Sequence, residues 1–168
     1  MAKELPDFLV VGHVTIDLMD QKSRLGGTAF YAALIAAKLG LNVGVFTSGK
    51  NDVALFSEQL RVQLVNVPSS CNTVFENIYR GENRVQYVHS VALPVPPSEL
   101  PEKWKSCPVV LLAPVANEVD VKFTEMFAGA LLGISLQGWL RQWKENGEVS
   151  PSSLGCLPLI GHAHVVFL

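Results

Sequence analysis

Two adjacent glycines followed by a run of small residues constrain this sequence most. Gly26 and Gly27 open the run, in which Ala dominates and Leu recurs, and both residue types favour helices. Gly40 follows, and glycine ends helices readily because it adopts the left-handed cap conformation at little cost. We therefore expect a helix over residues 28–39 that begins directly after the glycine pair.

An apolar, β-branched run stands upstream of the glycines. Residues 8–14 predict a buried strand, and Asp17 follows its end. In open α/β sheets, ligands bind beyond the carboxyl ends of the strands. A carboxylate there can accept hydrogen bonds from two hydroxyls, and glycines at a helix start let a ligand approach free backbone amides. This arrangement suits a polyhydroxylated ligand, although an ordinary Asp in a glycine-rich turn explains residues 8–40 equally well.

Predicted strands and helices then alternate along the chain. Strands are expected at 42–47, 61–67, 108–113, 131–136 and 165–168, and helices at 52–60 and 119–130, with a short helical or turn segment at 139–144. Residues 148–163 carry no strong signal. Such alternation indicates a single α/β domain, residues 1–168, built on a mainly parallel sheet.

One segment interrupts this alternation. Residues 73–79 and 84–91 are two strand-like runs, and the short loop between them contains Gly81. A loop of this length between such runs predicts a hairpin, which is antiparallel.

Composition excludes several classes of function. The net charge of −2 gives no electrostatic case for nucleic acid or for an anionic membrane surface. No apolar run is long enough to span a membrane, and charges precede the first one, so no signal peptide is indicated. We expect a cytoplasmic protein with a sizeable core, since 49% of its residues are hydrophobic and 17% are charged.

Three further patterns carry little weight. Residues 44–51 nearly match a phosphate-binding loop, but Asn51 replaces the required hydroxyl and the glycine lies within an apolar strand. No G-x-G-x-x-G dinucleotide pattern is present near the glycine pair. The three cysteines and four histidines show no metal-ligand spacing, and we expect no metal site from them; they are Cys71, Cys107, Cys156, His13, His89, His162 and His164.

Several motifs together resemble the ribokinase family of carbohydrate kinases. The run Val11-Gly-His-Val-Thr-Ile-Asp17, the glycine pair and a small-residue helix ending Lys38-Leu-Gly40 resemble the start of that family. Residues 73–79, 111–118 and 137–141 are most similar to an inositol-kinase-like branch. The resemblance covers roughly residues 8–145.

The resemblance implies a three-layer α/β fold, a β-hairpin that can act as a lid, a sugar or cyclitol substrate, and ATP with Mg²⁺ as cofactors of the complete enzyme. It implies substrate contacts for Asp17, Gly26, Gly27, Tyr31 and Glu118, and places Gln137 and Arg141 toward phosphate transfer. Two positions depart from the family pattern. Tyr31 stands where many members carry Asn, so the substrate need not be ribose, and Ser135 stands where relatives often carry Asp.

The family's catalytic Gly-Ala-Gly-Asp motif, whose Asp acts as the base, does not occur in residues 1–168. We therefore expect the substrate-side, amino-terminal portion of a sugar-kinase-like protein, which does not catalyse phosphoryl transfer alone. A non-catalytic sugar-binding or interaction module derived from that family is the alternative. Either way, an apolar strand at 165–168 without a further neighbour predicts self-association.

Overall fold

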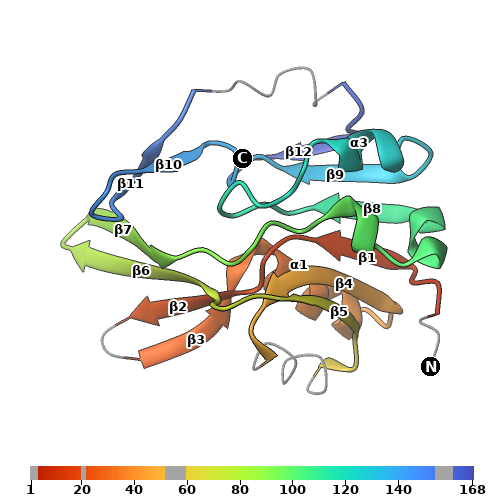
Figure 1. Cartoon of the computed structure of the whole chain (residues 1–168), viewed down its shortest axis with the longest axis horizontal. Helices are drawn as coiled ribbons and strands as arrows, with labels where there is room; N and C mark the ends of the chain where they lie inside the picture. The colour runs from red at the N-terminus through yellow and green to blue at the C-terminus, as the bar shows by residue number, and fades with distance from the viewer. Residues whose placement is uncertain (1–3, 20–21, 52–59, 154–160) are drawn as a thin grey trace.

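A central sheet of six strands organises the molecule (Figure 1). The computed structural model describes residues 4–19, 22–51, 60–153 and 161–168. The strands lie in the order β12-β9-β8-β1-β4-β5, and every pairing between neighbours is parallel. Their bounds are β1 Phe8–Val11, β4 Val43–Gly49, β5 Gln63–Pro68, β8 Val109–Leu112, β9 Leu131–Ser135 and β12 Val165–Phe167. The predicted parallel α/β sheet is confirmed.

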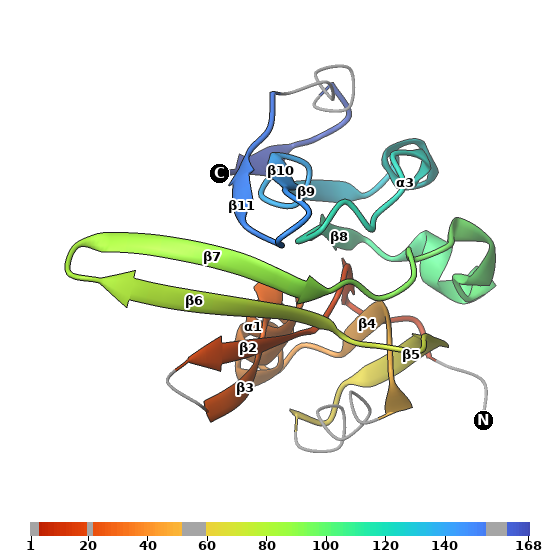
Figure 2. The ribbon, with the colours of Figure 1, turned by 60° about the vertical axis from the view of Figure 1, so that its left-hand side comes forward.

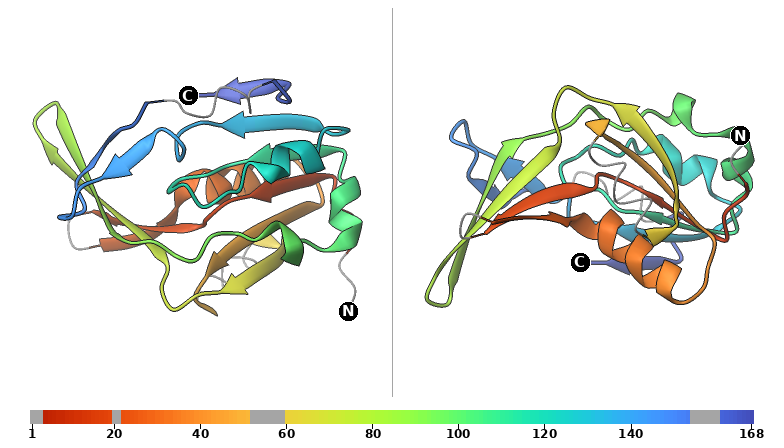
Figure 3. Two further views of the ribbon diagram at one scale, coloured as in Figure 1. Left: turned by 45° about the horizontal axis from the view of Figure 1, so that its top comes forward. Right: turned by 90° about the horizontal axis from the view of Figure 1, so that it is seen from below.

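Both faces of this sheet are covered, which explains its continuous apolar strands. On one face, helix α1 (Gly27–Lys38) packs through Ala29, Ala33 and Ala36 against a cluster that includes Val10. The small side chains let the helix approach the sheet closely. On the other face, Leu9 packs among bulky residues from η3 (Glu102–Ser106) and α3 (Lys122–Met126). Figure 3 shows α1 and α3 on opposite sides of the sheet.

A second, four-stranded sheet projects from the first (Figure 2). The predicted hairpin is present as β6 (Thr73–Arg80) and β7 (Asn83–Ser90), which pair antiparallel. It is joined by β2 (Thr15–Met19) and β3 (Lys22–Gly26), in the order β3-β2-β6-β7. We call these four strands the second sheet.

The stretch between Asp17 and the glycine pair, for which the sequence analysis expected no strand, forms part of an extra hairpin. β2 and β3 pair antiparallel with each other, and β2 pairs in parallel with β6, far away in sequence. The expected strand 8–14 is also interrupted. Gly12 has a φ of +153°, and a Cβ there would overlap the carbonyl of Ala113. The chain therefore leaves the central sheet at Gly12 and enters the second sheet at Thr15.

Two other segments differ from the expectation. The helix predicted at 119–130 is reduced to α3, because Val119 forms an isolated bridge with Val95 and Gly129 favours the helix poorly. Residues 139–144, expected to be helical or a turn, contain β10 (Arg141–Trp143). β10 pairs antiparallel with β11 (Val149–Pro151), which lies in the region without a sequence signal. The helix predicted at 52–60 lies outside the described residues except for its last position.

Among the described helices, none is long and apolar enough to cross a membrane.

Candidate functional site

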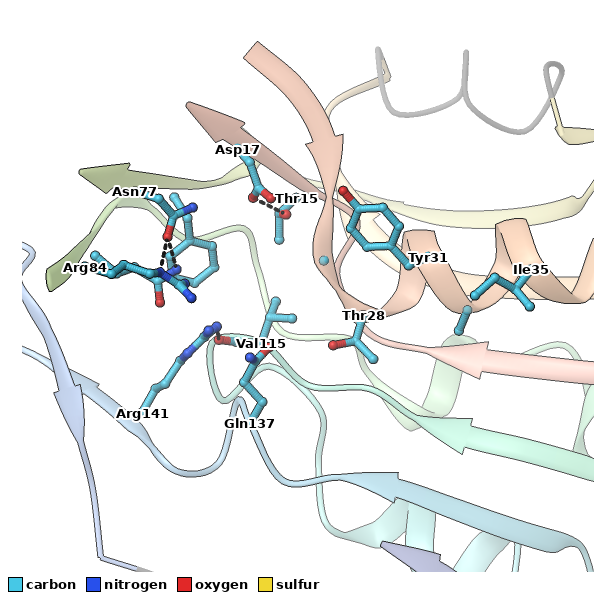
Figure 4. Close-up of a pocket in the computed structure, with 14 residues that line it drawn as sticks. Thr15, Asp17, Thr28, Tyr31, Ile35, Asn77, Arg84, Val115, Gln137 and Arg141 are labelled. Carbon is cyan, nitrogen blue, oxygen red and sulfur yellow. Dashed lines mark hydrogen bonds between the residues drawn. The ribbon is translucent and has the colours of Figure 1, made fainter. Parts of the chain in front are cut away.

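A cavity of about 410 Å³ lies where the second sheet meets α1 and the loops that follow β8 and β9. This volume falls in the range of roughly 300–1,000 Å³ that is usual for small-molecule sites. The side chains around it are predominantly polar at one end (Figure 4). Its polar lining residues are Thr15, Asp17, Thr28, Tyr31, Asn77, Arg84, Gln86, Gln137 and Arg141.

Asp17 is the carboxylate of this cavity. It extends from β2 and is half-buried, and its Oδ1 accepts a hydrogen bond of 2.9 Å from the hydroxyl of Thr15. Its carboxylate packs on the Cα of Gly26, where a Cβ would overlap it. Asp17 thus follows the end of β1, as expected, but it lies within a strand of the second sheet, and its contact with a ligand stays a prediction.

The glycine pair shapes the start of α1. Gly27 lines the cavity with a φ of +85°, a left-handed conformation, and a Cβ there would approach the carbonyl of His13. Gly26 is the N-cap, and no side chain caps the helix. The amides of Gly27 and Thr28 lie at this helix start, where backbone N–H groups can donate to a ligand. Gly26 itself does not line the cavity; it makes room for Asp17.

Tyr31 lines the same cavity from the first turns of α1 and is 43% exposed. Its ring meets the ring of Phe30 edge-on at a centroid distance of 5.1 Å. Figure 4 shows the hydroxyl of Tyr31 directed toward the side of the cavity that holds Asp17. A phenol at this position can both donate and accept a hydrogen bond.

Arg141 and Gln137 lie on the side of the cavity formed by the loop after β9 and by β10. Arg141 donates a 3.0 Å hydrogen bond to the carbonyl of Val115, and its guanidinium lies 5.1 Å from the ring centre of Phe75. Burial of the guanidinium, followed by the charge of Arg84, lowers the pKa of Arg141 to about 10. The group is still a cation at neutral pH.

The second sheet contributes polar residues that sequence reasoning did not single out. The Oδ1 atom of Asn77 on β6 accepts hydrogen bonds of 2.9 Å from Nε of Arg84 and from Nε2 of Gln86, both on β7. The three side chains share one face of the hairpin and line the cavity. Their alternation along two strands was the available signal, because residues two apart on a strand share a face.

Glu118 is not brought to the cavity, although it was predicted to contact the substrate. The residue is 2% exposed, and its carboxylate accepts hydrogen bonds from the backbone amides of His13, Val115 and Ala116, at 2.7–3.0 Å. These bonds tie the chain after β1 to the loop after β8. Glu118 therefore supports the site from behind, by holding together two loops at the carboxyl ends of the strands.

The structure thus gathers Asp17, Gly27, Tyr31, Gln137 and Arg141 around one cavity. Their contacts with a ligand remain predictions.

The described residues contain no cluster of three or more His, Cys, Asp or Glu that could hold a metal ion. His13 is buried and hydrogen-bonded to Thr73 and to the carbonyl of Leu93, and His89 pairs with Glu76 on the surface. One carboxylate, Asp17, lines the described cavity, and Mg²⁺ sites of this kind usually need further oxygen ligands from substrate phosphates. The residues of the chain that are described do not by themselves fit a Mg²⁺ site.

Residues 44–49 of the near-match to a phosphate-binding loop lie in β4 and are buried. A phosphate could not reach them, in agreement with the rejection of that motif.

Comparison with known proteins identifies the fold. The sequence matches no protein-family model and no curated protein. Among solved structures, a pyrophosphate-dependent kinase of the ribokinase family in complex with sulfate superposes with a TM-score of 0.79 at 21% identity. The alignment covers 95% of this chain and 60% of that one. This chain therefore has the ribokinase-family fold, which confirms the resemblance at the level of fold.

Individual neighbours extend this finding. A pyrophosphate-dependent kinase of the same family, complexed with a pyrophosphate analogue and myo-inositol, superposes with a TM-score of 0.78 at 21% identity, over 95% of this chain and 60% of that chain. A fructokinase from Halothermothrix orenii superposes with a TM-score of 0.73 at 11% identity, over 95% of this chain and 66% of that chain. The chain spans about 60% of the length of the first two neighbours.

Proposed function

We propose that this chain is the substrate-binding portion of a kinase that transfers a phosphoryl group to a hydroxyl of a sugar or cyclitol. The observation that carries the proposal is the position of Asp17, whose half-buried carboxylate faces a cavity of ligand size beside the uncapped start of α1. A neighbour of the same fold is complexed with myo-inositol, which supports a polyol as the ligand.

The residues take distinct roles in this proposal. Asp17 accepts hydrogen bonds from two neighbouring hydroxyls of the substrate, while the amides of Gly27 and Thr28 and the hydroxyl of Tyr31 orient the ring. Arg141 faces the acceptor hydroxyl from the other side and stabilises negative charge on the phosphoryl group. Phosphoryl transfer depends on such positioning and electrostatics more than on covalent chemistry.

The proton of the acceptor hydroxyl must go to a base. The Gly-Ala-Gly-Asp motif that supplies it in the resembled family is absent from the sequence, and Asp17 is assigned to binding. We therefore propose binding without turnover for this chain alone. When bound, ATP or another phosphoryl donor supplies the group to be transferred. Neighbours with this fold include an ATP-bound ribokinase and pyrophosphate-dependent kinases, so both donors belong in the test.

The experiment is calorimetric titration of the chain with myo-inositol, ribose and fructose, followed by turnover assays with ATP and with pyrophosphate. We expect at least one polyol to bind, Asp17→Ala to abolish most of that binding, and no turnover. Turnover by this chain alone would contradict the proposed division of roles. Binding unaffected by Asp17→Ala would favour the alternative, an interaction module that does not use this site.

A further inference from the structure

Two arginines from different parts of the chain stand at one end of the cavity. Arg84 extends from β7 of the second sheet and Arg141 from β10, and both guanidinium groups point into the space between them in Figure 4. Both also line an adjoining cavity of about 560 Å³, which extends toward β11. The pair therefore stands at the boundary between two ligand-sized spaces.

Neither arginine has a carboxylate partner within the described part of the chain. The ion pairs found there involve His89, Lys105 and Lys144 instead. Arg84 uses Nε to bond Asn77, and Arg141 uses one terminal nitrogen to bond the carbonyl of Val115. Each guanidinium carries five N–H groups, so most of their donors remain available for a ligand.

The two cations also disfavour each other. Arg84 is exposed and Arg141 is half-buried. Burial, and after it the charge of Arg84, lowers the pKa of Arg141, while the charges of Glu118 and Asp17 act in the opposite direction. Two like charges that face one cavity, with no ion pair to a carboxylate for either among the described residues, favour an anion that binds between them. Asn77, which also accepts a hydrogen bond from Gln86, holds Arg84 on the cavity face, so the guanidinium is oriented before any ligand binds.

We infer that Arg84 and Arg141 form a binding site for a phosphate-type oxyanion, at the opposite end of the cavity from Asp17. Two guanidinium forks suit a phosphate group, which carries close to two negative charges and three acceptor oxygens. The inference rests on the proposed function in one respect: the oxyanion then lies beside a polyol held by Asp17. Arg84, on the second sheet, would then help to select ligands that carry a phosphate group.

Inorganic phosphate is the first probe, titrated calorimetrically into the full chain at low ionic strength. We expect Arg84→Gln and Arg141→Gln each to weaken binding about tenfold, since hydrogen bonds to charged groups are the strong ones. Lys122→Gln removes one exposed positive charge from α3, far from both cavities in the fold, and is expected to leave the affinity unchanged. Arg84 is exposed, so its variant should fold even where Arg141→Gln does not.

The phosphate group can come from two sources, and two titrations separate them. A phosphate carried by the acceptor predicts that a myo-inositol monophosphate binds more tightly than myo-inositol, and that both Asp17→Ala and Arg84→Gln weaken it. A phosphate carried by the donor predicts that pyrophosphate binds together with myo-inositol, and that only the arginine variants weaken pyrophosphate binding. Either result supports the site.

The inference is overturned if neither phosphate nor pyrophosphate binds, or if their affinities do not change in Arg84→Gln and Arg141→Gln. The proposed function fails differently. If phosphate binding depends on both arginines, but no polyol binds and Asp17→Ala has no effect, the result supports the anion site. The same result contradicts the proposal that the cavity binds a polyol.

Discussion

The carboxylate of Asp17 on β2 packs directly on Gly26 of β3, in the space where any other residue at position 26 would place its Cβ. Gly26 is also the N-cap of α1, and its backbone is extended rather than left-handed. The requirement for glycine here is thus one of space. It links the glycine pair, the most constraining feature of the sequence, to the orientation of the carboxylate that faces the cavity.

Gly26→Ala is therefore expected to displace the Asp17 carboxylate. We expect a loss of about 1–3 kcal/mol in the free energy of unfolding, typical of overpacking, together with weaker polyol binding. Denaturant unfolding and calorimetry measure the two effects. Gly129→Ala is the matched control, because a Cβ at Gly129 meets nothing within 4 Å. Full polyol affinity in Gly26→Ala would show that the position of Asp17 does not matter for binding.

Asp17→Ala is expected to weaken polyol binding by about 2–3 kcal/mol, the value of hydrogen bonds to a charged group. Because Asp17 is half-buried and bonds Thr15 alone among the described side chains, the fold should persist. Calorimetry gives the affinity and circular dichroism the fold. Glu76→Gln, which changes a carboxylate on β6 that does not line the cavity, should leave binding unchanged. Equal affinities for wild type and Asp17→Ala would return Asp17 to a structural role.

Glu118→Gln tests the support behind the site. Both carboxylate oxygens accept hydrogen bonds from backbone amides, and a glutamine would turn its NH₂ group toward one of those donors. We expect the free energy of unfolding to fall by about 2–3 kcal/mol. Glu125→Gln, an exposed position on α3, is the control and should have little effect. A stability equal to wild type would mean that the buried amides find other acceptors.

The pH dependence of phosphate binding tests the charge of Arg141. The guanidinium of Arg141 carries its charge only below its pKa. Because that pKa is lowered to about 10, we expect the affinity for phosphate to fall as the pH rises through this value. Phosphate is already a dianion well below that pH, since its second pKa is about 6, and does not contribute to the fall. Titrations at intervals from pH 8 to 11 measure this profile. Bound phosphate should raise the pKa of Arg141, because a nearby anion favours the charged guanidinium. An Arg141→Gln protein whose residual binding shows the same decline would exclude Arg141 as the titrating group.

Self-association tests the exposed edge of the central sheet. Within the described residues β12 pairs with β9 alone, and Val165 and Phe167 are 45% and 52% exposed. Apolar edge strands pair with other chains, and a charge on the edge opposes this. We propose that the chain self-associates through β12, and that Phe167→Lys shifts light scattering toward monomer. Leu93→Lys, at an exposed apolar residue elsewhere, should not. A wild-type protein that is monomeric at high concentration would contradict the prediction.

The sequence by itself determined the elements whose signal is local. The alanine-rich run after the glycine pair made α1, because helix propensity and packing of small residues act within a few turns. The continuous apolar runs made β1, β4 and β8, since strands buried on both faces need no polar alternation. The position of Asp17 at the cavity could be predicted because it closely follows the first of these runs.

Only the tertiary structure decided which other side chains join Asp17. Arg84 and Arg141 line one cavity because β7 contacts β11, the partner strand of β10. Glu118 lies buried because its carboxylate accepts a hydrogen bond from the amide of His13, 105 positions away. β2 became a strand by pairing with β6 across more than fifty residues. These outcomes depend on pairings between distant segments, and no local pattern of residues encodes the partner of a strand or of a buried polar group.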